Sequence, residues 1–289
     1  MRNKKSAFSL IEISIVVLII GILVAGITQS SRLISSSKIS TAQTLTQSSP
    51  ISSNKGLMLW LETSSEASFA SSESSDGAAV TVWNDINSQS ISKLFARTNG
   101  AGLVTYKTSS PIGGLPSLYF AASTTGMTLS TASASAVASP IVSAGFTFFA
   151  VYKEDTNAAH SVFYNGTTGT NGWGFLNGGS STRTIQTAAV AHGTTATTLY
   201  STNPTISSGT YDGTTLKLFT NGATDAIATP ATAVSTATAG MYIGSKDASA
   251  TGAFLGYISE IVIFDNALRD DDREAIEAYL GKKYGIKVN

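Results

Sequence analysis

The stretch SAFSLIEISIVVLIIGILVAG (residues 6–26) is apolar except for a few serines and one charged residue, Glu12. The apolar run extends from Phe8 to Ile27, and a helix of 20 residues reaches across a hydrocarbon layer of roughly 30 Å. The sequence therefore predicts a transmembrane helix over residues 8–27. A carboxylate at the centre of such a helix costs roughly 2.5–3.5 kcal/mol, so Glu12 requires a functional reason.

Residues 1–7 form a short polar leader with three basic residues. An ordinary secretory signal peptide has a shorter apolar region that ends in a small-x-small cleavage site, and this segment fits neither criterion. Instead, KKSAFSLIEISIVVLIIGILVAG (residues 4–26) resembles the N-terminus of type IV prepilins. In that family a basic leader ends in Gly or Ala, and a Glu follows the first mature residue by four positions. Ala7, Phe8 and Glu12 match these positions, and Ala7 stands where Gly is more usual.

The resemblance implies processing and polymerisation. A prepilin peptidase, which is a membrane aspartic peptidase, would cleave between Ala7 and Phe8, and Phe8 would then be N-methylated. Glu12 would face the terminal amino group of a neighbouring subunit. Phe8 and Glu12 are four residues apart and share one helical face, so a charge-assisted contact there would fix the axial register. The alternative is a plain membrane anchor whose Glu12 reaches the membrane interface.

The predicted helix continues beyond the membrane. Residues 28–48 are rich in Ser and Thr, and Pro50 is a plausible stop signal, so we expect helix to about Gln47. Such a composition makes a weak helix in isolation, and the alternative for residues 35–55 is a flexible tether. The chain is thus divided into a leader (1–7), a pilin-like helix (8–50) and a globular domain (51–289).

The composition of the globular part excludes several classes of function. The chain has no cysteine, which excludes disulfides and thiolate chemistry. From Gly56 onward, 12 basic and 17 acidic residues give a net charge of −5, and there is no basic block to attract nucleic acid. Abundant Gly, Ser, Thr and Ala with 12% charged residues favour many short strands and turns.

Short apolar or alternating runs predict β-strands throughout this part. We expect strands at 56–62, 79–85, 117–122, 146–153, 160–166, 173–177, 215–222, 240–246 and 254–264. Asp212-Gly213 and Asn221-Gly222 are hairpin signals. Many antiparallel strands in one domain predict a two-sheet β-sandwich or jelly roll. Residues 269–284 follow as an amphipathic C-terminal helix with acidic first turns.

An ordered set of segments resembles the concanavalin A-like (laminin-G-like) domains of bacterial surface proteins. The resemblance covers residues 56–286 and implies a mainly-β jelly-roll sandwich with a C-terminal helix. Arg269 stands where that family usually has a small helix-capping residue. The segments are LMLWLETSS (57–65), VTVWNDINSQS (80–90), GLPSLYF (114–120), FTFFAVYK (146–153), YDGTTLKLFTNG (211–222), MYIGS (241–245) and GYISEIVIFDNALRDDDREAIEAYLGKKYGI (256–286).

Some members of this fold are glucanases with closely spaced acids on one strand. The nearest candidates, Glu260 and Asp265, are five positions apart and face opposite sides of a regular strand. We interpret Glu260 as a polar strand residue and Asp265 as a turn residue. His160 and His192 have no partner at metal-ligand spacing. The sequence therefore predicts no catalytic residues and a protein that is not an enzyme.

Two kinds of ligand site stay open. The family resemblance allows calcium in the rim loops, although no dense ligand run is present. Trp173, flanked by glycines in TNGWGFLNGG (170–179), is the best candidate for an exposed sugar-stacking ring, and packing in the core is its alternative. Trp60 and Trp83 lie in strand patterns and are expected in the core. The oxygen ligands considered for calcium are Asp76, Asp85, Asn87, Asp212 and Asp247.

Together the two resemblances predict a structural or adhesive subunit of a type IV pilus or pseudopilus-like filament that displays a laminin-G-like domain. Such a precursor would reside in the bacterial inner membrane before it joins an extracellular filament. One alternative is a carbohydrate- or matrix-binding minor pilin at the filament tip, since a domain of this size would crowd a continuous array. A membrane-anchored glycan hydrolase is a further alternative.

Overall fold

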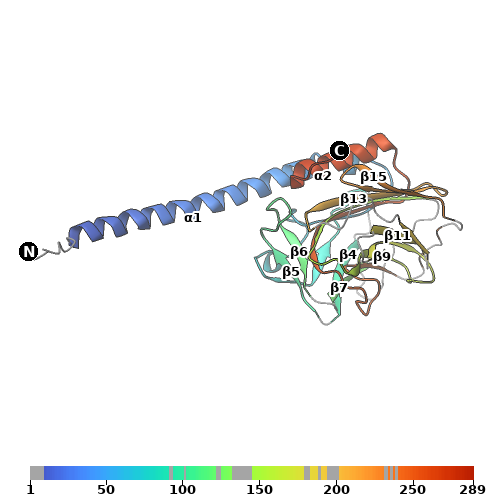
Figure 1. Ribbon diagram of the computed structural model, residues 1–289, viewed down its shortest axis with the longest axis horizontal. Coiled ribbons are helices and arrows are strands. Elements are labelled where there is room, and N and C mark those ends of the chain that lie inside the picture. Colours follow the sequence, from blue (N-terminus) through green and yellow to red (C-terminus); the bar gives the residue numbers. More distant parts are fainter. Residues whose placement is uncertain are drawn as a thin grey trace, which may run out of the picture.

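The computed structural model describes residues 10–90, 94–100, 102–121, 125–131, 145–178, 183–187, 190–193, 202–230, 234, 237 and 240–289. Helix α1 (Leu10–Gln47) is unbroken over 38 residues, a length of about 57 Å. Figure 1 shows it projecting far beyond a β-rich body, against which only its C-terminal end is packed. The segment Leu10–Ile27 is long and apolar enough to cross a membrane, and none of it is buried within the chain.

The Ser/Thr-rich half of α1 is helical up to Gln47. Up to that residue the structure therefore has the predicted helix, and not the flexible tether considered for residues 35–55. The hydroxyl groups of this half are accommodated locally, because several of those described donate to the carbonyl oxygen four residues earlier. These donors include Ser30, Thr41, Thr44 and Thr46, and Ser48 does the same directly after the helix. A short 3-10 helix, η1 (Pro50–Ser53), follows and leads into the first strand.

The body is a sandwich of two antiparallel sheets, as predicted. Nine strands of the described residues form the first sheet, in which β17 pairs with β8 along one edge and with β6 and β1 along the other. Its members are β15 (Ala223–Ala228), β14 (Leu216–Thr220), β13 (Thr205–Tyr211), β8 (Phe146–Glu154), β17 (Gly256–Phe264), β6 (Ser117–Phe120), β5 (Val104–Lys107), β2 (Ala79–Val80) and β1 (Leu57–Glu62).

The second sheet has eight strands in the described part of the chain and lies against the first (Figure 1). In spatial order it contains β12 (Val190–Gly193), β11 (Arg183–Thr187), β10 (Trp173–Gly178), β9 (Ala159–Asn165), β16 (Met241–Ile243), β7 (Thr125–Thr131), β4 (Leu94–Gly100) and β3 (Val82–Asn84). Every stretch expected as a strand contains strand residues, but 79–85 is divided into β2 and β3, which belong to different sheets. Several of the strands that the pattern missed, such as β7 and β13, are rich in small and hydroxylated residues.

The first sheet is buried on both faces. On β8, Phe148 and Ala150 belong to the core between the sheets, whereas the alternate residues Phe149 and Val151 belong to a second apolar cluster. This second cluster also contains Ala42 of α1 and residues of the C-terminal helix α2 (Asp270–Tyr284). Both helices therefore cover the outer face of the nine-stranded sheet, where α1 meets the body.

Helix α2 begins without a side-chain cap. Arg269 occupies the capping position and its side chain makes no capping hydrogen bond, while Asp270, Asp271 and Asp272 lie in the first turn. Carboxylates at this end of a helix are stabilised by the helix dipole, which compensates in part for the missing cap. The helix ends at Gly285, whose φ of 66° is left-handed and suits glycine.

Candidate functional site

The apolar half of α1 is the first candidate site. Every described side chain from Leu10 to Ile27 is exposed, including that of Glu12. The predicted cleavage residues Ala7 and Phe8 lie outside the described residues. A continuous apolar helix surface with no cover from its own chain is suited to lipid or to the helices of other subunits.

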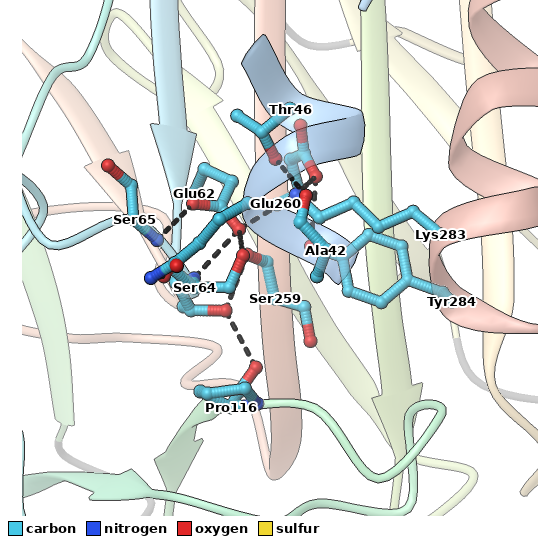
Figure 2. A network of polar contacts seen from close by, with 12 residues as sticks. Ala42, Thr46, Glu62, Ser64, Ser65, Pro116, Ser259, Glu260, Lys283 and Tyr284 are labelled. Atoms are coloured by element: carbon cyan, nitrogen blue, oxygen red, sulfur yellow. Dashed lines mark hydrogen bonds and ion pairs between the residues drawn. The ribbon is translucent and has the colours of Figure 1, made fainter. Parts of the chain in front are cut away.

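The second candidate site lies where α1 meets the sandwich. Glu62 of β1 and Glu260 of β17 are directly opposite each other across the two strands. The Nζ atom of Lys283, from α2, lies 2.7 Å from Oε1 of Glu62 and 2.8 Å from Oε2 of Glu260. All three side chains are fully buried (Figure 2). One cation therefore bridges two anions that would otherwise repel each other.

The two carboxylates receive different sets of additional donors. Oε1 of Glu260 accepts a hydrogen bond of 2.7 Å from Nε1 of Trp60, and Oε2 accepts one of 2.8 Å from the hydroxyl of Tyr284. Glu62 instead accepts from the backbone N–H and the hydroxyl of Ser64 and from the backbone N–H of Ser65. Because the remaining oxygen lone pairs are largely satisfied, the cluster is compatible with complete burial.

Helix α1 is tied to this cluster through its last turns. The hydroxyl of Thr46 lies 3.3 Å from the hydroxyl of Tyr279, which in turn accepts a hydrogen bond of 3.2 Å from Lys283. The side chain of Gln43 donates to the carbonyl of Ser64 at 3.0 Å. Figure 2 shows the α1 turn that carries Ala42 and Thr46 passing over the three charged residues. Helix α1 is therefore positioned by α2 and by the segment that follows β1.

Burial and charge act in opposite directions on these groups. Burial raises the pKa of Glu260 above its ordinary value, and the neighbouring Lys283 only partly opposes this effect. For Lys283, burial alone would lower the pKa, but the adjacent Glu260 and Glu62 outweigh it and raise the pKa well above the ordinary value. Lys283 is therefore charged at neutral pH and holds the cluster together.

Comparison with known proteins agrees with this architecture. Residues 121–272 match the model of the concanavalin A-like lectin/glucanases superfamily, which is more than half of the chain. This chain belongs to that superfamily. Residues 2–28 match the prokaryotic N-terminal methylation motif, so the lectin-like sandwich is joined to a type IV pilin N-terminus. No curated protein sequence matches the chain.

Solved structures share the fold of the lectin-like sandwich at low identity. Domain 4 of an extracellular arabinanase from Geobacillus stearothermophilus, in complex with arabinotriose, is 14% identical with a TM-score of 0.56, covering 78% of this chain and 98% of that domain. The binding domain of botulinum neurotoxin serotype D is 12% identical with a TM-score of 0.52, covering 81% and 53%. Trypanosoma rangeli sialidase is 14% identical with a TM-score of 0.50, and the 82% of this chain that aligns covers only 34% of that enzyme. These likenesses show the fold alone.

The structure corrects the hypothesis that Trp173 is an exposed sugar platform. Trp173 is 1% exposed, and its ring stacks on Phe146 with centroids 3.8 Å apart and planes 7° apart. The neighbouring glycines have another reason: a Cβ on Gly174 would lie 2.6 Å from the carbonyl oxygen of Phe163. The glycines permit close packing of strands around the indole, so they do not signal exposure. Trp60 and Trp83 are also buried.

The acids considered for calcium serve as local backbone acceptors. Asp76 accepts from Thr108, and Asp212 accepts from the backbone N–H groups of residues 214 and 215. Asp85 accepts from the backbone N–H groups of Trp60 and Asn87. Asp247 similarly accepts from residues 249 and 251. Within the described part of the chain, no three His, Cys, Asp or Glu side chains gather as a metal site.

The remaining titratable candidates are separated in the fold. Glu260 is buried beneath α2, whereas Asp265 is exposed after the end of β17. His160 is buried, and its Nε2 atom lies 3.3 Å from Oε1 of Glu154 on the facing sheet. The backbone of His192 belongs to β12, where its side chain lies outside the described residues.

Sequence reasoning missed Glu62 and Lys283 and underestimated Glu260. In the sequence, Lys283 is one of two cations in the last helical turn, where positive charge is favourable at the surface. The available signal was its spacing: Lys283 follows Tyr279 by four residues and therefore lies on the apolar side of the helix. Lys282 is exposed, as its position on the opposite side predicts.

Proposed function

We propose that this chain is a structural or adhesive subunit of a type IV pilus or pseudopilus-like filament. Prepilin peptidase would cleave it between Ala7 and Phe8, the apolar helix would leave the bilayer, and the lectin-like sandwich would be displayed outside. The observation that carries the proposal is the coincidence of the methylation motif with a helix that buries none of its apolar residues Leu10–Ile27. Such a surface requires lipid before assembly and neighbouring helices afterwards.

Glu12 has a defined task in this scheme. After cleavage, Phe8 would carry a free or methylated amino group one helical turn from Glu12. In an apolar filament interior, a carboxylate that meets an ammonium of the adjacent subunit is far less costly than an isolated carboxylate. The pairing would select one axial step between subunits, because other steps leave both charges unpaired.

The junction between α1 and the sandwich supports a fixed orientation of the displayed domain. Thr46 and Gln43 of α1 bind the sandwich beside the buried Glu62–Lys283–Glu260 cluster, so the filament helix and the domain form one packed unit. A flexible tether would leave the orientation of the sandwich relative to α1 undefined, whereas this connection fixes the direction in which the sandwich faces. A fixed display suits a filament subunit better than a simple membrane anchor.

The experiment that tests the proposal is replacement of Glu12 in the native host. Glu12→Ala should still insert in the membrane but should be absent from sheared filaments, because the register contact is lost. Incorporation at the level of the unmodified chain would contradict the role given to Glu12.

A second candidate function is glycan binding by a minor subunit at the filament tip. The arabinanase domain with the same fold was solved in complex with arabinotriose, which makes short glycans reasonable first ligands. The facing carboxylates Glu62 and Glu260 are covered by α1 and α2, so we assign them no hydrolytic role. Binding of arabino-oligosaccharides by the purified chain, without their cleavage, would support this function; cleavage by the purified chain would support the hydrolase instead.

A further inference from the structure

Lys283 is a primary amine held against two carboxyl groups without access to water. Its Nζ atom lies 2.8 Å from Oε2 of Glu260 and 2.7 Å from Oε1 of Glu62, and all three side chains are fully buried. Three aromatic residues surround the group: Trp60 and Tyr284 bind Glu260, and Tyr279 binds Lys283. Close, fixed contact between an amine and a carboxyl group in the absence of water favours condensation to an amide, because proximity replaces a bimolecular encounter.

The two carboxyl groups are prepared for different roles. Glu62 accepts hydrogen bonds from the N–H and hydroxyl groups of Ser64 and from the N–H of Ser65, which together occupy both of its carboxylate oxygens. Glu260 binds the indole N–H of Trp60 through Oε1, the oxygen that does not contact Lys283. That donor is placed to stabilise negative charge on Oε1 during attack at the carboxyl carbon.

We propose that Lys283 and Glu260 become joined by an intramolecular amide bond, with Glu62 carrying the proton. Glu62 removes a proton from the Lys283 ammonium, and the resulting amine attacks Cδ of Glu260. The charge that develops on Oε1 is held by Trp60. The bond from Cδ to Oε2 then breaks, and Oε2 leaves as water after it receives two protons from the nitrogen, one of them through Glu62. Overall, an ammonium and a carboxylate become an amide and one water, and no redox partner is needed.

The reaction is expected to be slow and to occur once in each molecule. Because burial is outweighed by Glu260 and Glu62, the pKa of Lys283 is raised, so the reactive amine is a small fraction at any moment. After reaction, Glu62 keeps its three donors from Ser64 and Ser65, and the amide oxygen keeps Trp60. The hydroxyl of Tyr284 donates to Oε2, the oxygen that leaves, so Tyr284 loses this acceptor while Trp60, Ser64 and Ser65 keep theirs.

The position of this bond suits a filament subunit. The chain has no cysteine, so it cannot close a disulfide. An amide from Lys283 to Glu260 would fasten α2 to β17, the strand that pairs with β8, β6 and β1. Helix α2 also contacts α1 through Tyr279 and Thr46. The bond would keep the contact between α1 and the sandwich closed under tension. This mechanical role goes beyond the assembly role proposed above.

The test is mass spectrometry of the full chain purified from bacterial membranes in detergent. We expect an intact mass lower by one water molecule than the mass calculated for the same N-terminus. Proteolysis should release a branched peptide that contains residues 260 and 283. Lys283→Arg, which keeps the cation but cannot form this amide, should have the full mass, and so should Glu62→Gln. The control Lys282→Arg alters the exposed neighbour and should retain the bond.

The possible results distinguish an amide between Lys283 and Glu260 from an unreacted ion pair. A folded, unsubstituted chain of full mass with separate linear peptides for residues 260 and 283 would overturn the proposal, as would a loss of water that persists in Lys283→Arg. A branched peptide in Glu62→Gln would overturn the role given to Glu62. The branched peptide is read independently of the N-terminus, so this result is separate from whether the chain is cleaved and assembled.

Discussion

The hydroxyl of Thr46 in α1 lies 3.3 Å from the hydroxyl of Tyr279 in α2, although 233 positions separate the two residues. This contact joins the helix that carries the pilin motif to the last helix of the lectin-like sandwich. A double-mutant cycle with Thr46→Val and Tyr279→Phe should give a coupling free energy of about 0.5–1.5 kcal/mol in urea unfolding. The same cycle with Thr44→Val, at an exposed position of α1, should give no coupling, and equal values for the two cycles would refute a direct contact.

Removal of the buried cation should destabilise the domain strongly. Lys283→Met leaves Glu62 and Glu260 buried, facing each other and without their common partner, so the free energy of unfolding should fall by about 3–5 kcal/mol. Lys282→Met is the matched control, because that side chain is exposed, and its effect should stay within about 0.5 kcal/mol. Urea unfolding measures both, and equal effects would show that Lys283 does not hold the cluster.

Two tryptophans allow the charged hydrogen bond to be separated from packing. Trp60 donates to the carboxylate of Glu260 at 2.7 Å, whereas Trp83 donates to the neutral backbone carbonyl of Glu62 at 2.9 Å. Trp60→Phe and Trp83→Phe remove similar volumes, but bonds to charged groups are worth about 1.5–3 kcal/mol and neutral ones about 0.5–1.5 kcal/mol. In the background of Lys283→Arg, which cannot form the amide, thermal unfolding should therefore show the larger loss for Trp60→Phe, and the reverse order would contradict the proposed electrostatic role of Trp60.

Glu277 should give the stability of the domain a measurable pH dependence. Burial raises the pKa of Glu277, and its contacts with Ser208 and Arg273 only partly oppose this effect. The folded state therefore binds the proton more tightly than the unfolded state. The contribution of Glu277 to stability is present in full below the ordinary glutamate pKa and is lost as the pH rises through the folded value.

The measurement is urea unfolding across the acidic to neutral range. The difference in unfolding free energy between the unsubstituted chain and Glu277→Gln should fall as the pH rises through that window. Glu274→Gln is the control, since the Glu274 side chain is 65% exposed. A Glu277 difference that grows with pH would mean that Arg273 controls the titration instead of burial.

Much of the fold was readable from the sequence because apolar alternation marks strands that face the core. FTFFAVYK and GYISEIVIF each became a long buried strand, β8 and β17. Strand β13, TISSGTY, is equally buried, but its Ser, Thr and Gly residues give no apolar period. It is a strand because β8 and β14 supply hydrogen bonds on both sides, a tertiary cause that local pattern does not report.

The candidate site residues also differ in whether local sequence or only tertiary structure reveals them. Glu12 was recognisable because a lone acid in an apolar helix is conspicuous in the sequence. Glu62, Glu260 and Lys283 are far apart in the chain, and only the pairing of β1 with β17 brings the two acids together beneath α2. The glycines around Trp173 left both exposure and core packing open, because tight strand packing and loop exposure both favour glycine.

The central claim is that the chain is cleaved, exported and polymerised through its N-terminal helix. The most direct measurement is the N-terminal residue of the protein recovered from sheared cell-surface material. We expect N-methylated Phe8 in that fraction. A chain that starts at Met1 and is found only in the membrane would contradict it.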